Sequence, residues 1–297
     1  MFTLIKNAHI YAPADTGCQD LLLAGRKIVH MAPSIGELPF DCTVIDVSGA
    51  KVTTGFIDQH IHITGGGGEG SFATRVPEIQ LSQLTTAGTT TVIGLLGTDG
   101  VTRSMENLLA KARGLEEEGI STWIYSGAYP ADSGHITGTL RSDIVLIDKI
   151  LGGKVAMSDH RSSMPSTQAY ASLAAEARIG GMLSGKAGVL HIHMGDGKRG
   201  LEPVLEILET TELPISYLYE EMLSIVKAGV LPFDKALQLI TCNVADALKL
   251  EDKGRIAVGK DADLIVWNDD LTLNKVFARS RLMVDKGQAV VKGTFEN

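Results

Sequence analysis

Two histidines stand two residues apart at the end of an apolar run, in the segment GFIDQHIHITGGGGEG. Residues i and i+2 of a strand project from the same face, so the imidazoles of His60 and His62 would point the same way. Neutral imidazoles presented together suit Zn²⁺. A polar end to a strand, without a metal, is the structural alternative.

Four glycines, Gly65 to Gly68, follow this pair and lead directly to Glu69. Glycine allows a backbone to approach a ligand closely or to adopt a positive φ. The loop is therefore predicted to bring the Glu69 carboxylate beside the metal pair. A flexible loop with no ligand is the alternative.

A single lysine, Lys154 in GGKVAMSDHRS, is predicted to open a strand and to point inward among apolar neighbours. A buried ammonium is costly unless it is paired, deprotonated or modified. In a metal site it can take up CO₂, and the two oxygens of the carbamate can bridge two cations. The alternative is a surface lysine whose stem lies along apolar neighbours.

A second histidine pair, His191 and His193, shares one strand face in GVLHIHMGDGKRG, and Asp196 lies in the following turn. At least one of these residues could bind a second metal, and structural histidines are the alternative. Arg161, which follows His160, could clamp a substrate carboxylate. Tyr129 could donate a hydrogen bond to a carbonyl oxygen that gains negative charge, and loop anchoring is the alternative for both.

The central region, predicted as residues 55–252, alternates apolar strand-like runs with amphipathic stretches. The runs are TTVIGLLG, STWIYSGA, GGKVAMS and GVLHIHMG, and the stretches include MENLLAKARGLEEEG and TQAYASLAAEARIGGML. This βαβα rhythm predicts a parallel sheet, and polar residues just after the strands indicate an α/β TIM-type barrel. About five strands and the start of a sixth in LPISYL are present, whereas a closed barrel has eight. The barrel is therefore predicted to be incomplete, with two or three βα units missing.

Both ends of the chain show short apolar runs separated by Gly, Pro and Asp, as in small antiparallel β units. Residues 1–54 contain FTLI, LLLAG, KIVHM and TVIDV, and residues 253–297 contain RIAVG, DLIVWN, LMVDKG and AVVKG. Neither end has enough core alone, so the two are predicted to pair into one small β-sandwich domain.

The composition narrows the choice of partner and compartment. The 297 residues carry a net charge of −8 and no basic cluster, which disfavours nucleic acid and anionic membranes and favours a small-molecule substrate. Three widely spaced cysteines indicate free thiols in a reducing cytoplasm. Neither an export leader nor an apolar run of membrane-spanning length is present, which also favours a cytoplasmic location.

The segment GFIDQHIH, together with GRIAVGKDADLIVWN, resembles the amidohydrolase superfamily, in which a metal-bearing barrel accompanies a split β domain. The ordered segments HITGGGGEG, GLLGTDG, SGAY, SDHRS and HMGD are similar to those of isoaspartyl (β-aspartyl) dipeptidases. The resemblance extends from the N-terminus to about Leu218 and resumes through Asn297.

The resemblance implies a zinc metallo-dipeptidase with two metals in each subunit, and a homo-oligomer. His60 and His62 would hold the first zinc, a carbamate on Lys154 would bridge the two, and His193, which precedes MGD, would hold the second in preference to His191. The residues expected around a β-aspartyl dipeptide are Gly67, Gly68, Glu69 and Thr98 at its amino end, Arg161 at its carboxylate and Tyr129 at the scissile carbonyl. In the family, a metal-bridged hydroxide attacks the β-linked amide and an Asp moves the proton to the leaving amine.

The sequence departs from the family pattern after LPISYL, so the resemblance implies that an internal segment is missing near residues 218/219. The family continues with a His, an Asn-Arg pair and a Ser-Ser-Asp-Gly segment, whereas here Leu218 runs into YEEMLSIVKAGVLPFDKALQLITCNVADALKL, which is predicted to be helical. No histidine follows His193, so one His ligand of the family is missing. The Ser-Ser-Asp-Gly segment is also absent, and with it the metal carboxylate and the proton-transferring Asp. Such losses lower rates by orders of magnitude. Two alternatives stay open: a cyclic-amide or N-acyl amino acid hydrolase, and a catalytically silent metal-binding protein.

Overall fold

The computed structural model describes residues 2–211, 218–220 and 233–296, and its centre is a parallel sheet. The six strands are β6 (Phe56–Ile61), β7 (Thr89–Gly94), β8 (Ser121–Ser126), β9 (Ile150–Met157), β10 (Val189–Met194) and β11 (Leu218–Glu220). They lie in the order β11-β10-β9-β8-β7-β6, and every neighbouring pair is parallel. The prediction of an incomplete TIM-type barrel is confirmed.

The end of this sheet falls where the sequence departs from the family pattern. The predicted start of a sixth strand in LPISYL, residues 213–218, lies outside the described residues except for Leu218, where β11 begins. Residues 212–217 and 221–232 lie outside the described part of the chain, so the internal segment expected near 218/219 stays a prediction. Beyond them, the predicted helices are present as α6 (Phe233–Leu239) and α7 (Cys242–Ala247).

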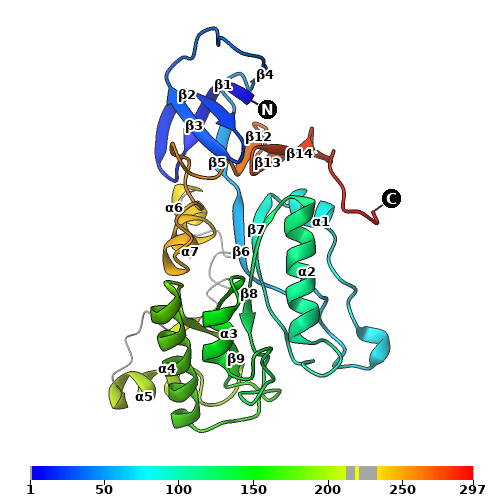
Figure 1. The fold of residues 1–297 in the computed structure, drawn as a ribbon, viewed down its shortest axis with the longest axis vertical. Helices are drawn as coiled ribbons and strands as arrows, with labels where there is room; N and C mark the ends of the chain where they lie inside the picture. The colour runs from blue at the N-terminus through cyan, green and yellow to red at the C-terminus, as the bar shows by residue number, and fades with distance from the viewer. Residues whose placement is uncertain (1, 212–217, 221–232, 297) are drawn as a thin grey trace.

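The remaining helices follow or flank the strands, as a βαβα pattern requires (Figure 1). They are the short 3-10 helix η1 (Phe72–Thr74), α1 (Leu81–Thr85), α2 (Met105–Glu118), α3 (Leu140–Leu146), α4 (Thr167–Ser184) and α5 (Glu202–Thr210). The Ser104 hydroxyl caps α2 by accepting a hydrogen bond from the Asn107 amide at 3.2 Å. The helix ends at Gly119, whose φ of 138° favours glycine. None of the described helices combines the length and apolar character that crossing a membrane requires.

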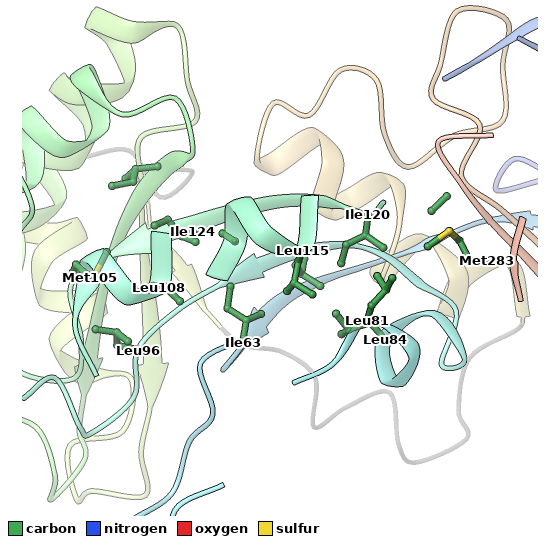
Figure 2. Packing of buried hydrophobic residues seen from close by; sticks show 14 of the residues in the cluster. Ile63, Leu81, Leu84, Leu96, Met105, Leu108, Leu115, Ile120, Ile124 and Met283 are labelled. Atoms are coloured by element: carbon green, nitrogen blue, oxygen red, sulfur yellow. The ribbon is translucent and has the colours of Figure 1, made fainter. Parts of the chain in front are cut away.

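The apolar face of α2 packs into the largest hydrophobic cluster, which reaches from the parallel sheet to the C-terminal strands. Figure 2 shows Leu108 and Leu115 of α2 close to Ile63 and Ile120, with Met283, from near the C-terminus, at the far end of the cluster. Removing these side chains from water stabilises the fold by about 1.5–3 kcal/mol for each fully buried residue. The cluster therefore holds α2, and the loop that precedes it, against the sheet.

The two ends of the chain form one antiparallel-rich sheet, as predicted. The N-terminal strands are β1 (Phe2–Tyr11), β2 (Asp15–Ala24), β3 (Lys27–Ala32), β4 (Cys42–Asp46) and β5 (Lys51–Thr54), and the C-terminal strands are β12 (Leu264–Trp267), β13 (Leu273–Ala278), β14 (Arg281–Asp285) and β15 (Gln288–Ala289). Strands β5 and β12 join the two ends, with Thr53 opposite Ile265. β5 leads almost directly into β6, so one segment connects the two sheets (Figure 1).

Two strand predictions are wrong. RIAVG was expected to be a strand, but residues 255–259 form turns whose last amide, that of Gly259, donates to the Ile28 carbonyl at 2.8 Å. Lys154 was expected to open its strand, but β9 begins four residues earlier at Ile150. The paired glycines before Lys154 suggested a strand boundary, whereas a Cβ on Gly152 would lie 2.1 Å from the Val189 carbonyl oxygen. Glycine there permits close approach to β10 within the strand.

A buried lysine links the two sheets. Lys253, only 2% exposed, lies 2.7 Å from carboxylate oxygens of both Asp261 and Asp263. Its ammonium also donates to the Ser121 hydroxyl, at the first residue of β8, at 2.6 Å. The lysine therefore shares its positive charge between two buried carboxylates that lie just before β12, and Lys27 also pairs with Asp261 at 2.9 Å. The hydrogen bond to Ser121 ties this segment to the parallel sheet.

Replacing Lys253 by Met should destabilise the protein strongly, because two buried carboxylates would lose their shared cation. We expect the free energy of unfolding to fall by about 3–5 kcal/mol, as for other buried pairs that lose one partner. Urea unfolding of the variant beside Lys198→Met, whose lysine is exposed on the loop after β10, measures the difference. Equal stability of the two variants would show that Lys253 does not link the sheets.

Candidate active site

The predicted site residues come together at the carboxyl ends of the parallel strands. They are His60 and His62 at the end of β6, Thr98 after β7, Tyr129 after β8, Lys154 within β9, Arg161 after β9 and His193 within β10. Parallel hydrogen bonding places these ends along one edge, because every strand runs in the same direction. The register sets His193 beside Ala156 and His191 beside Lys154.

The imidazoles of His60, His62 and His193 lie close enough to Lys154 to be affected by its charge. The His60 ring centroid lies 5.7 Å from that of His62 and 6.1 Å from that of His193. Burial, followed by the positive charge of Lys154, lowers the pKa of His60 to about 2. The same two causes lower the pKa of His62 and of His193. All three rings are therefore neutral at physiological pH, which is the form that binds a metal.

The two histidines of β10 have different surroundings. His191 is fully buried, stacks on Tyr125 with ring centroids 4.8 Å apart, and has Nε2 2.9 Å from Nδ1 of His60. His193 is partly exposed and stacks on Tyr129 at 4.7 Å. The side chain of Asp196 is exposed on the following turn, and that of His160 is 78% exposed. Of the predicted residues on this segment, His193 is thus the one that lies against the predicted substrate residues.

The donor chemistry of the histidines is compatible with zinc. The rings are neutral, Lys154 is 3% exposed, and Nδ1 of His62 is buried without a hydrogen-bond partner in the described part of the chain. No three His, Cys, Asp or Glu side chains of the described ranges form a group that could hold a metal ion. A metal here would therefore need a ligand in addition to histidine, and a carbamate on Lys154 could provide it.

A chain of charged groups connects the histidines to the glycine loop. Asp159 accepts two hydrogen bonds from Arg161, from Nε at 3.0 Å and from Nη2 at 2.7 Å, and lies 3.0 Å from Nε2 of His193. Nη1 of Arg161 lies 3.5 Å from Glu69, which accepts a hydrogen bond from the Thr98 hydroxyl at 3.1 Å. The hydrogen bonds from Arg161 hold the pKa of Asp159 well below its usual range, and the same hydrogen bonds raise the pKa of Arg161. Both groups are therefore charged.

The glycine loop and Tyr129 form the walls of a small pocket beside these charges. Gly67 and Gly68 have φ values of 68° and 100°, and a Cβ on Gly67 would lie 2.8 Å from the Thr74 carbonyl oxygen. Other side chains would strain this backbone. His62, Gly67, Glu69, Thr98 and Tyr129 are among the residues that line the pocket. The guanidinium carbon of Arg161 lies 5.2 Å from the centre of the Tyr129 ring.

The sequence patterns did not predict a role for two residues of this site, Asp159 and Arg103. Asp159 stands beside His160 and Arg161 after β9, and a carboxylate two residues before an arginine was a usable signal. Arg103 precedes α2 in VTRSMENLL and is 4% exposed, yet nothing in that segment distinguishes it from a surface arginine. Only tertiary structure brings Arg103 against the glycine loop, 37 residues earlier in the chain.

The family model of the amidohydrolases matches residues 113–296, which is more than half of the chain. The chain belongs to the amidohydrolase family. This amidohydrolase is also similar over most of its length to a β-aspartyl dipeptidase of Fervidobacterium islandicum AW-1, with 35% identity and a TM-score of 0.91. That comparison covers 97% of this chain and 98% of the other. A structure of the Fervidobacterium enzyme in complex with β-Asp-Leu dipeptide gives 34% identity, a TM-score of 0.89 and the same coverage.

More distant relatives share the amidohydrolase fold or a short segment. The N-acetylglucosamine-6-phosphate deacetylase of Pasteurella multocida, 14% identical with a TM-score of 0.61, supports the fold alone; it covers 96% of this chain and 100% of its own. A dihydroorotase of Syntrophus aciditrophicus is 34% identical over 65 residues, which is 21% of this chain. The matched segment spans 15% of that dihydroorotase, so it says little about the whole enzyme.

Replacing Asp159 by Asn should weaken the binding of added zinc at the histidine cluster. A carboxylate that hydrogen-bonds a ligating histidine fixes the ring orientation, and its loss typically lowers metal affinity 10–100-fold. Competition with a fluorescent zinc chelator measures the affinity, and Asp196→Asn is the matched control because its carboxylate is exposed on the turn that follows β10. Unchanged affinity in Asp159→Asn would mean that the Asp159 contact does not orient a metal ligand.

Proposed function

We propose that this protein binds β-aspartyl dipeptides and hydrolyses their β-linked amide with the help of zinc. The observation that carries the proposal is the pair of opposite charges, Glu69 and Arg161, 3.5 Å apart beside Tyr129 and the histidines. The N-terminal residue of a β-aspartyl dipeptide has an ammonium and a carboxylate on one carbon. Adjacent anionic and cationic side chains match that zwitterion, whereas an ordinary peptide offers no free α-carboxylate at this position.

Binding would replace the Glu69–Arg161 ion pair by two ion pairs with the substrate. In the free protein Glu69 and Arg161 face each other across a partly exposed gap, where a lone ion pair contributes little. The substrate ammonium would take the place of Arg161 beside Glu69, and the substrate carboxylate would pair with the Nη1 side of Arg161. Asp159 keeps Nε and Nη2 fixed through two hydrogen bonds, so the guanidinium stays oriented during the exchange.

Similarity to a protein solved with its dipeptide supports the same choice of substrate. The Fervidobacterium β-aspartyl dipeptidase was obtained with β-Asp-Leu, and this chain is 34% identical to it across nearly the whole length. Gly67, Gly68 and Thr98 would surround the amino end of such a ligand, next to Glu69. Tyr129, held between His193 and Arg161, would donate its hydroxyl hydrogen to the scissile carbonyl oxygen as negative charge develops there.

The zinc ligands would be His60, His62, Lys154 as its carbamate, and His193. When bound, zinc supplies a Lewis acid for the carbonyl and lowers the pKa of water so that hydroxide is available near neutrality. Burial keeps the imidazoles in the neutral form that such binding requires. No histidine follows His193 in the sequence, and the family's proton-transferring Asp has no counterpart. We therefore expect binding of the dipeptide by this chain to be stronger evidence of function than its rate of turnover.

The test of function is calorimetric titration of the zinc-loaded chain with β-Asp-Leu, followed by a chromatographic assay for released leucine. Binding in the micromolar to millimolar range with release of leucine supports the dipeptidase. Preference for a dihydropyrimidine or an N-acyl amino acid would indicate a different amidohydrolase. Binding without any release would indicate a catalytically silent relative, and absence of binding to all three ligands would refute the proposal.

Replacing Glu69 by Gln should weaken β-Asp-Leu binding about 10–100-fold, because a charged hydrogen bond to the substrate ammonium would be lost. Glu78→Gln, which changes a half-exposed carboxylate paired with Lys111, is the control. The dissociation constants of both variants are measured by the same titration. A Glu69→Gln variant that binds as tightly as Glu78→Gln would exclude Glu69 from the ammonium site.

Replacing Lys154 by Met should reduce the zinc held after dialysis, because the bridging ligand would be absent. Metal analysis of the purified variant against the unmodified protein measures this loss, and intact-mass analysis of the unmodified protein at neutral pH detects one added CO₂. Lys149→Met is a matched control, because this lysine is equally buried but donates to the Thr122 carbonyl at 3.0 Å, away from the histidines. Full zinc content in Lys154→Met would remove the lysine from the metal site.

A further inference from the structure

A buried arginine binds carbonyl groups of the glycine loop. The guanidinium of Arg103 donates from Nε to the Thr64 carbonyl at 3.1 Å, and from Nη2 to the carbonyls of Gly66 at 3.1 Å and Val76 at 3.0 Å. Its Nη1 donates to Asp99 at 3.2 Å. One side chain therefore connects three carbonyls from two segments with the loop that follows β7.

The two segments are also held directly against each other. The Val76 amide donates to the Gly66 carbonyl at 2.8 Å, and Gly67 pairs with Arg75 as an isolated bridge. Because the glycines have no side chains, the backbones approach closely enough for one guanidinium to reach both. Glu69 lies two residues beyond Gly67, so its position depends on where this paired backbone is fixed.

The charge of Arg103 is balanced within the same network. Burial alone would raise the pKa of Asp99, but hydrogen bonds from Thr102 and Val101, together with Arg103, lower it to about 2. Asp99 directly follows Thr98, whose hydroxyl donates to Glu69. Arg103 is thus connected to Glu69 in two ways. It binds the glycine loop that leads to Glu69, and it binds Asp99, whose neighbour Thr98 donates a hydrogen bond to Glu69. Carbonyl oxygens and a carboxylate satisfy the guanidinium, which makes its orientation specific.

We propose that Arg103 is a positioning residue that sets the place of Glu69, and so the selectivity of the site for a ligand with a free ammonium. This inference rests on the proposed dipeptide function. Arg103 does not need to touch the substrate. Its loss should weaken those ligands that use Glu69 and leave other ligands of the same site largely unaffected.

The test compares Arg103→Met and Arg103→Lys with Arg113→Met, in the full zinc-loaded chain. Arg113 lies on α2, half-exposed, and pairs with Asp148 at 2.7 Å, so its variant controls for loss of an arginine near this helix. Each protein is titrated with β-Asp-Leu and with succinyl-leucine, which is the same molecule without the α-amino group. Arg103→Met should bind β-Asp-Leu about tenfold more weakly and succinyl-leucine nearly as before. Arg103→Lys should recover part of the loss.

Coupling and local exchange separate positioning from general damage. Adding Glu69→Gln to Arg103→Met should cause little further loss, because both changes act on the same ammonium contact. Hydrogen exchange of the amides in residues 64–76 should become about tenfold faster in Arg103→Met, with no change in residues 105–118. Equal weakening of both ligands, additive effects with Glu69→Gln, or unchanged exchange in residues 64–76 would overturn the inference.

Failure of the proposed function gives a different result. If the unmodified chain binds neither ligand, the dipeptide proposal fails, whatever the Arg103 variants do. If the unmodified chain binds β-Asp-Leu and Arg103→Met binds it equally well, the dipeptide proposal stands and the role of Arg103 is refuted.

Discussion

Parallel pairing of β6 to β10 is the constraint on which the site depends, since it brings the carboxyl ends of five strands to one edge of the sheet. The pairing of β9 with β10 is particularly close, because Gly152 leaves no room for a side chain against the Val189 carbonyl. This contact sets the register that places Lys154 beside His191 and, two residues further, Ala156 beside His193. A shift of one residue would turn these side chains to the opposite face.

Charge compensation explains how so many polar groups remain inside. Asp159 is paired with Arg161, and the Arg103 charge is balanced by Asp99. Away from the site, Lys253 shares its positive charge between two buried carboxylates just before β12, and Lys27 also pairs with one of them. A buried charge without such partners would cost several kcal/mol, so each pairing restricts the arrangement of the elements around it.

The end-formed sheet contributes to the site indirectly. Its strand β5 leads into β6, and Met283 of β14 completes the apolar cluster that holds α2. Arg103 lies two residues before α2 and donates a hydrogen bond to the Gly66 carbonyl. The cluster that fixes this helix therefore also helps to fix the glycine loop. Packing far from the histidines therefore influences the place of Glu69.

The sequence alone predicted the fold class, the pairing of the chain ends and most of the side chains that gather at the candidate site. Period-2 spacing of His60 with His62, the glycine run before Glu69 and the polar residues after each strand are local patterns, and local patterns can be read along a chain. Tertiary structure decided what depends on distant neighbours. Strand β9 extends through two glycines because β10 approaches closely there. His191 and His193 have different surroundings, since His191 stacks on buried Tyr125. Arg103 hydrogen-bonds to a loop that lies 37 residues earlier in the chain. Those outcomes depend on hydrogen bonds and packing between segments far apart in sequence, which no spacing within one segment records.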